Sequence, residues 1–169
     1  MDKRYLLIVF ITLICGINMY IISENSDFIG SASVNFDRYT ISLPQNYVLI
    51  KSETSFIQIF NSNLGYLAIE HKNVNYSNDE SVLKAIGIPN NRTILSNGTI
   101  TANNITLNSM FLKTMNDRGN ETDRAIFYFN KFNTTFIISM SGFNQDTDNK
   151  EVIDIASKIA ASLRINYKI

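Results

Sequence analysis

Few side chains in this 169-residue chain could carry out chemistry. His71 is the only histidine, so a serine or cysteine nucleophile would lack its usual base and a histidine-rich metal site is absent. Neighbouring residues of a strand point to opposite faces, so Glu70 does not join His71 as a second ligand. We interpret His71 as an exposed residue at a strand end, and predict no catalytic residue, no metal site and no cofactor.

The acidic segment NQDTDNKE, residues 144–151, is the strongest polar cluster. Asp146, Asp148 and Glu151 could hold a hard cation through oxygen ligands. An EF-hand loop that began at Asp146 would need Gly sixth and Glu twelfth, where this chain has Glu151 and Ser157. Capping of a following helix explains the same carboxylates, and we adopt that interpretation. Carboxylates distant in the sequence could still form a hydrolytic pair.

Six asparagines stand in the Asn-x-Ser/Thr pattern of N-glycosylation acceptors. Five of the six use Thr, a clearer excess over chance than the total number. Each falls in an expected turn or on a polar strand face, although Asn and Thr are also common turn residues. We hypothesise N-glycosylation at Asn75, Asn91, Asn97, Asn104, Asn120 and Asn133.

The N-terminal segment is suited to a membrane. Lys3 and Arg4 precede the uncharged residues 5–22, which as a helix would span roughly 27 Å, close to the ~30 Å hydrocarbon core of a bilayer. The positive-inside rule then places the N-terminus in the cytoplasm. A cleaved signal peptide and a buried helix are the alternatives. We predict a signal anchor or transmembrane helix at 1–23, a polar tether at 24–33, and an extracytoplasmic α+β domain at 34–169.

The predicted domain is rich in strands. Alternating apolar residues change phase at Asp37-Arg38, which predicts a hairpin from Val34 to Leu43. The dipeptide Asn97-Gly98 is a strong turn signal and predicts a second hairpin, with Ile94, Ile100 and Ile105 buried. The same alternation predicts further strands within 47–60, 64–72, 104–116, 124–132 and 134–143.

Two helices are expected among these strands. Residues 77–90 carry cap signals at Ser77 or Asn78 and stop signals at Gly87 and Pro89. From Asn149 to about Leu163, apolar residues recur at helical spacing, so this helix should cover one side of the sheet. The predicted fold class is therefore α+β: an N-terminal transmembrane helix, then an antiparallel β-sheet domain packed with an internal helix and a C-terminal helix.

This order of elements resembles the Mog1/PsbP-like family over residues 34–169. The resemblance lies in the opening hairpin, which ends in YTISLPQNY, and in the closing helix DNKEVIDIASKIAASLRI. Family members often have Gly-Trp after the proline, where this chain has Asn46-Tyr47 and no tryptophan. The resemblance implies a non-enzymatic binding or assembly module.

Charge excludes one class of partner. The chain has 15 basic and 15 acidic residues, with no Lys/Arg run longer than two, so we expect no nucleic-acid partner. We predict a single-pass protein of the cell membrane, which meets the bilayer through residues 5–22 and binds a protein or surface polymer outside. An exported hydrolase with dispersed carboxylates is the alternative. Two carboxylates converging in a concave pocket would favour the hydrolase, and an exposed apolar face would favour the binding module.

Overall fold

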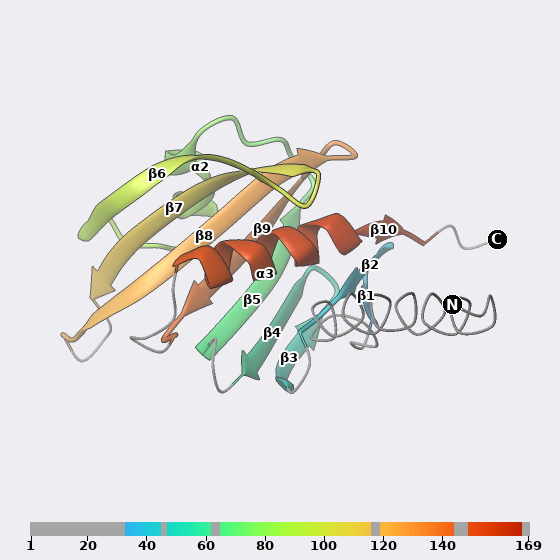
Figure 1. The fold of residues 1–169 in the computed structure, drawn as a ribbon, viewed down its shortest axis with the longest axis horizontal. Helices are drawn as coiled ribbons and strands as arrows, with labels where there is room; N and C mark the ends of the chain where they lie inside the picture. Colours follow the sequence, from blue (N-terminus) through green and yellow to red (C-terminus); the bar gives the residue numbers. More distant parts are fainter. Residues whose placement is uncertain (1–32, 45–46, 62–64, 116–118, 144–148, 167–169) are drawn as a thin grey trace, which may run out of the picture.

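The computed structural model describes residues 33–44, 47–61, 65–115, 119–143 and 149–166. Within them, a seven-stranded antiparallel sheet forms the centre (Figure 1). In spatial order its strands are β3 (Tyr47–Glu53), β4 (Phe56–Asn61), β5 (Gly65–Lys72), β9 (Thr134–Ser141), β8 (Glu121–Lys131), β7 (Ile105–Met115) and β6 (Arg92–Ala102).

A second, three-stranded sheet joins the two ends of the described chain. Its order is β1 (Ser33–Phe36), β2 (Tyr39–Ser42) and β10 (Arg164–Ile165), all antiparallel. The helices are α2 (Asp79–Ala85) and α3 (Asn149–Ser162). Figure 1 shows α3 across one face of the large sheet, and α2 on the other side. The predicted opening hairpin, internal helix and C-terminal helix are confirmed.

The predicted fold class needs one correction. Among the described residues, no helix is long and apolar enough to cross a membrane. The fold that these residues form is mostly antiparallel β-sheet with two helices. The anchor predicted at 1–23 and the tether at 24–33 lie outside the described residues. No described residue tests the predicted contact with a membrane, the single-pass topology or the location outside the cytoplasm.

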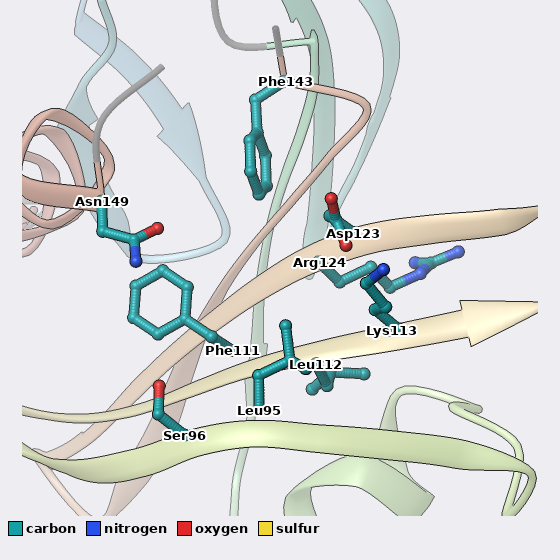
Figure 2. Close-up of a pocket in the computed structure, with 9 residues that line it drawn as sticks. All are labelled: Leu95, Ser96, Phe111, Leu112, Lys113, Asp123, Arg124, Phe143 and Asn149. Carbon is teal, nitrogen blue, oxygen red and sulfur yellow. The ribbon is translucent and has the colours of Figure 1, made fainter. Parts of the chain in front are cut away.

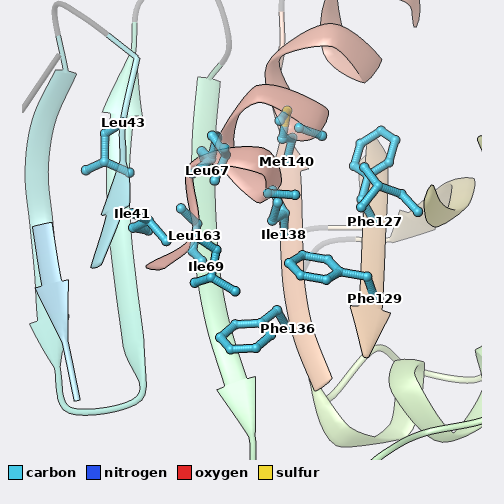
Figure 3. Close-up of a cluster of buried hydrophobic side chains, with 14 of the residues drawn as sticks. Ile41, Leu43, Leu67, Ile69, Phe127, Phe129, Phe136, Ile138, Met140 and Leu163 are labelled. Carbon is cyan, nitrogen blue, oxygen red and sulfur yellow. The ribbon is translucent and has the colours of Figure 1, made fainter. Parts of the chain in front are cut away.

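The main core lies between the large sheet and the layer formed by α3 and β2. The helix contributes its buried stripe of Val152, Ala156, Ile159 and Ala160. Figure 3 shows Ile41 of β2, and Leu43 just after that strand, beside the inward side chains of β5, β9 and β8. Three of those inward side chains are phenylalanines. Phe129 and Phe136 stack on each other with ring centroids 5.3 Å apart, and Phe127 packs edge-on to Phe111 of β7 at 5.9 Å. We call this side of the sheet the α3 face.

A smaller core fills the opposite side, the α2 face. Val82 and Leu83 of α2 pack on the outward side chains of β7, β8 and β9, which include Met110, Ile126 and Ile137. Asn78 caps the helix because its side chain accepts a hydrogen bond from the Ser81 N–H at 2.9 Å. This short helix covers only part of the α2 face. It packs on β7, β8 and β9, and it does not cover β5, β4 and β3.

Polar contacts hold α2 against the sheet. Asp79 accepts hydrogen bonds from the Tyr128 hydroxyl at 2.8 Å and from the Asn97 amide at 3.0 Å. Glu80 forms an ion pair with Arg92, whose side chain is largely buried. Burial and the neighbouring Asp79 carboxylate raise the pKa of Tyr128. Tyr128 is thus a core residue, because α2 covers that part of the sheet.

The predicted turn at Asn97-Gly98 is wrong. Strand β6 continues through both residues and pairs with β7 from Arg92 to Ala102. The turn comes at Asn103 and Asn104, which have φ values of 51° and 59°. Asparagine tolerates this left-handed region better than most residues, so an Asn-Asn pair can form the tight turn that Asn-Gly usually provides. The predicted burial of Ile94 also fails, since 46% of it is exposed.

The interpretation of His71 as an exposed residue is also wrong. Only 4% of it is accessible, and its ring packs edge-on to Tyr39 with centroids 5.2 Å apart. Nε2 lies 3.6 Å from a carboxylate oxygen of Asp37, in the turn between β1 and β2. Burial lowers the pKa of His71, and the Asp37 carboxylate opposes that shift in part. His71 therefore helps to join the small sheet to the large one.

The first prediction compares two glycines. Gly65 has φ of +68°, and a Cβ there would collide with the carbonyl oxygens of Ser141 and Gly142. Gly65→Ala should lower the free energy of unfolding by at least about 2 kcal/mol, from left-handed strain and the collision together. Gly98→Ala should change it by less than about 0.5 kcal/mol, because Gly98 is in an open strand. Urea denaturation measures the free energy of unfolding of both variants. An equal loss in the two would indicate that Gly98 is in a turn, and would contradict a continuous β6.

The second prediction concerns pH. Because burial lowers the pKa of His71 in the folded state, the unfolded chain takes up the proton first. Stability should therefore fall as the pH drops below about 6.5 and continue to fall until folded His71 titrates. His71→Phe keeps an aromatic ring in place and should reduce this fall. Thermal unfolding between about pH 7.5 and about pH 5 measures it; identical slopes for both proteins would contradict the assignment.

Candidate functional site

A row of exposed apolar side chains crosses three strands on the α2 face, in a part of the sheet that α2 does not cover. Val48 of β3 lies opposite Phe60 of β4, and Phe60 lies opposite Tyr66 of β5. Their exposed fractions are 60%, 37% and 49%. The Phe60 and Tyr66 rings pack on each other, with centroids 5.2 Å apart. We call these three residues, together with Leu49 and Ile50 of β3, the β3–β5 surface.

The β3–β5 surface continues around the edge of the sheet. Leu49 pairs with Ile59 of the main core, so its side chain points to the α3 face, opposite to that of Val48. Half of Leu49 and half of Ile50 are nevertheless exposed. Strand β3 is the last in its sheet, so one side of it has no strand partner in the described chain. Apolar side chains therefore lie on both sides of an open edge.

Charged residues border this surface. Lys51 and Glu53, at the end of β3, form an exposed ion pair with a nitrogen-to-oxygen distance of 2.7 Å. The Lys51 ammonium also lies 5.7 Å from the centroid of the Phe56 ring. An apolar centre with a polar border is the usual arrangement of a protein–protein contact.

A cavity of about 210 Å³ lies elsewhere, among β6, β7, β8 and the start of α3. Figure 2 shows the Phe111 ring beside Asn149 and below Phe143, with Lys113 and Asp123 across the opening. Lys113 at this cavity already pairs with Glu121 at 3.1 Å. Its volume is below the ~300 Å³ at which most small-molecule sites begin.

The described lining of this cavity does not contain the pair of carboxylates that a hydrolase needs. Asp123 is the one carboxylate among the described residues that line the cavity. No group of three or more His, Cys, Asp or Glu side chains in the described chain is arranged to hold a metal. Of the acidic cluster, Glu151 lies exposed in the first turn of α3, whereas Asp146 and Asp148 are outside the described residues.

All six asparagine acceptors are exposed in the structure. Asn97 lies within β6, Asn104 and Asn133 occupy turns with positive φ, and Asn75, Asn91 and Asn120 lie between elements. The Asn75 amide donates to the Asn133 carbonyl oxygen at 3.1 Å, which brings these two acceptors side by side. Modification itself stays a prediction.

The β3–β5 surface was missed from the sequence. The signal was present in Tyr47 to Ile50, four consecutive apolar residues of one strand. Such a run is typical of a central strand buried on both faces. Only the strand order reveals that β3 is an edge, where the same run is exposed.

Comparison with known proteins supports the fold alone. No protein-family model matches the chain, and no curated protein sequence does. Among solved structures, a crystal structure from Bacteroides thetaiotaomicron VPI-5482 at 1.50 Å resolution is similar over 82% of this chain and 49% of its own, with TM-score 0.52 and 13% identity. The chain thus spans about half the length of that protein.

Another similar structure is the solution structure of cyanobacterial PsbP, CyanoP, from Synechocystis sp. PCC 6803. It matches 79% of this chain and 90% of its own, with TM-score 0.51 and 8% identity. At such identities the likeness establishes architecture and not ancestry, activity or partners. The resemblance predicted from the opening hairpin and the closing helix is thereby confirmed for the fold, and the described domain has a PsbP-like fold.

Proposed function

We propose that this domain is a protein-binding module, and that its partner contacts the β3–β5 surface. The observation that carries the proposal is the apolar row of Val48, Phe60 and Tyr66 beside an open strand edge. Contiguous exposed apolar surface is uncommon on a monomeric protein without a binding role. Aromatic side chains are also enriched where proteins meet.

The geometry favours an extended segment of the partner. Val48 and Leu49 point to opposite faces of the sheet, and each is at least half exposed. A helix laid on one face would cover one of them and leave the other in water. A strand paired to the edge of β3 would cover both, and would satisfy the outward backbone groups of β3 as well. A partner strand with apolar residues on both faces therefore fits best.

The alternative of an exported hydrolase has less support. It requires two carboxylates that converge in a concave site, and the described part of the cavity provides Asp123 alone. The apolar surface, in contrast, is the feature expected of a binding module. The proposal therefore follows the surface and not the cavity.

A location outside the cytoplasm is a separate proposal. It rests on Lys3, Arg4 and the uncharged run at 5–22, which are typical of an export signal. The six exposed acceptors are compatible with an outer environment. Protease treatment of intact cells tests it, since an exported domain should be digested and a cytoplasmic control protein should not.

The third prediction uses a matched pair of valines. Val48→Lys places a charge in the proposed contact, whereas Val74→Lys places the same charge at another exposed valine, between β5 and α2. Once a partner has been captured and purified, Val48→Lys should weaken its binding at least about tenfold, or ~1.4 kcal/mol. Val74→Lys should leave the Kd unchanged. Isothermal titration calorimetry measures both, and equal thermal unfolding of the two variants controls for folding.

Two results would contradict the proposal. Equal binding by both variants would place the contact elsewhere. Self-association of the pure domain that Val48→Lys abolishes would show that a second copy occupies the surface.

Hydrogen exchange adds an independent measurement, because a paired partner strand should slow exchange of the β3 amides, and unchanged rates would exclude strand addition.

A further inference from the structure

The other edge of the large sheet is formed by β6, and neither charged residues nor proline protect most of its length. Edge strands are commonly guarded by charges or proline, because their unpaired backbone groups invite another strand. Beyond Arg92, the eleven-residue β6 has no charged residue and no proline. The Arg92 guanidinium is turned inward to Glu80 and is largely buried, so it does not guard the edge.

Most of this strand is in contact with solvent. Residues 93–99 are all exposed, including 46% of Ile94 and 56% of Leu95. A register shift between Ile94 and Ser96 marks a bulge, which helps to protect an edge strand, but β3 has a bulge as well, between Leu49 and Lys51. At the opposite edge, β3 at least presents Lys51 and Glu53. The longer edge is thus the less protected one.

The asparagine acceptors are distributed unevenly over the two edges. Asn91 immediately precedes β6, Asn97 lies at its middle, and Asn104 follows it in the turn to β7. Asn91 and Asn97 are six residues apart, about 20 Å along a strand. No acceptor lies in residues 47–61, which form β3, β4 and the turn between them. The part of the sheet proposed to bind a partner is therefore free of acceptors.

The Asn97 side chain can be modified without loss of its contact. Its amide nitrogen donates one hydrogen bond, to Asp79 at 3.0 Å. A primary amide carries two hydrogens, so replacement of the other one by a sugar leaves that bond in place. The side chain is on the α2 face at the rim of the sheet, because Asn97 pairs with Met110 of the smaller core. A glycan there would extend past the edge into solvent.

We propose that Asn91 and Asn97 carry N-linked glycans that shield the β6 edge from pairing with other strands. The sugar donor is an oligosaccharide activated by a diphosphate leaving group and delivered by a transferase. The asparagine nitrogen forms a bond to the anomeric carbon, the carbon–oxygen bond to the diphosphate breaks, and the amide proton is released. The bulk and solubility of the glycan then keep a second strand away.

The fourth prediction tests occupancy and shielding separately. The full chain is produced in a host that modifies Asn-x-Thr acceptors, and glycopeptide mass spectrometry reports each site. Thr93→Ala with Thr99→Ala removes the acceptors at Asn91 and Asn97 but retains both asparagines. Ser77→Ala with Thr122→Ala is the matched control, since it removes the acceptors at Asn75 and Asn120. Thr93→Ser with Thr99→Ser changes the same positions and keeps the acceptor pattern.

Light scattering coupled to gel filtration then reports self-association. The Thr93/Thr99 alanine variant should shift from monomer to dimer or larger species, and the serine variant and the Ser77/Thr122 control should not. Unmodified wild-type protein from a host without the transferase should behave like the alanine variant. Absence of glycans at Asn91 and Asn97 would overturn the assignment. Equal self-association of both alanine variants, or of neither, would overturn the shielding role.

Discussion

Burial of both faces of β8 and β9 is the constraint on which this structure depends. Ala125, Phe127 and Phe129 of β8 face one core, while Ile126 and Tyr128 face the other. Such strands are stable only when each face has its own cover, because an uncovered face would expose several large side chains. The α3 and β2 layer supplies one cover and α2 the other. The exposed row of Val48, Phe60 and Tyr66 lies where α2 no longer covers the sheet.

Patterns that depend on residues close in the sequence allowed the helices to be predicted. The order of the strands in the sheet, which decides what covers each strand, could not be predicted in this way. The helical stripe from Val152 to Leu163 and the stop at Gly87 depend on residues close in the chain, so they were predicted correctly. His71 was mistaken for an exposed residue because its burial comes from Tyr39, which is distant in the sequence. Val48 was overlooked for the same reason: nothing local distinguishes an edge strand from a central one.

The turn after β6 shows how a strong local signal can be overruled. Asn97-Gly98 favours a hairpin, yet a turn there would divide an eleven-residue ladder with β7. Asn103 and Asn104 accept the required positive φ at modest cost, and they preserve the longer pairing. The cumulative pairing of two long strands thus prevails over the preference of one dipeptide.

The small sheet brings the two ends of the described chain together. Strands β1 and β10 flank β2, and the Asn166 side chain donates to Asn35 while it accepts from Thr40. Joining the ends through a short linker, and opening the chain at an exposed hairpin, would therefore need little rearrangement of the fold. A circular permutant could be opened at the Asn103-Asn104 turn, which is exposed. This turn is not part of β3, β4 or β5, so the strands of the β3–β5 surface would stay continuous.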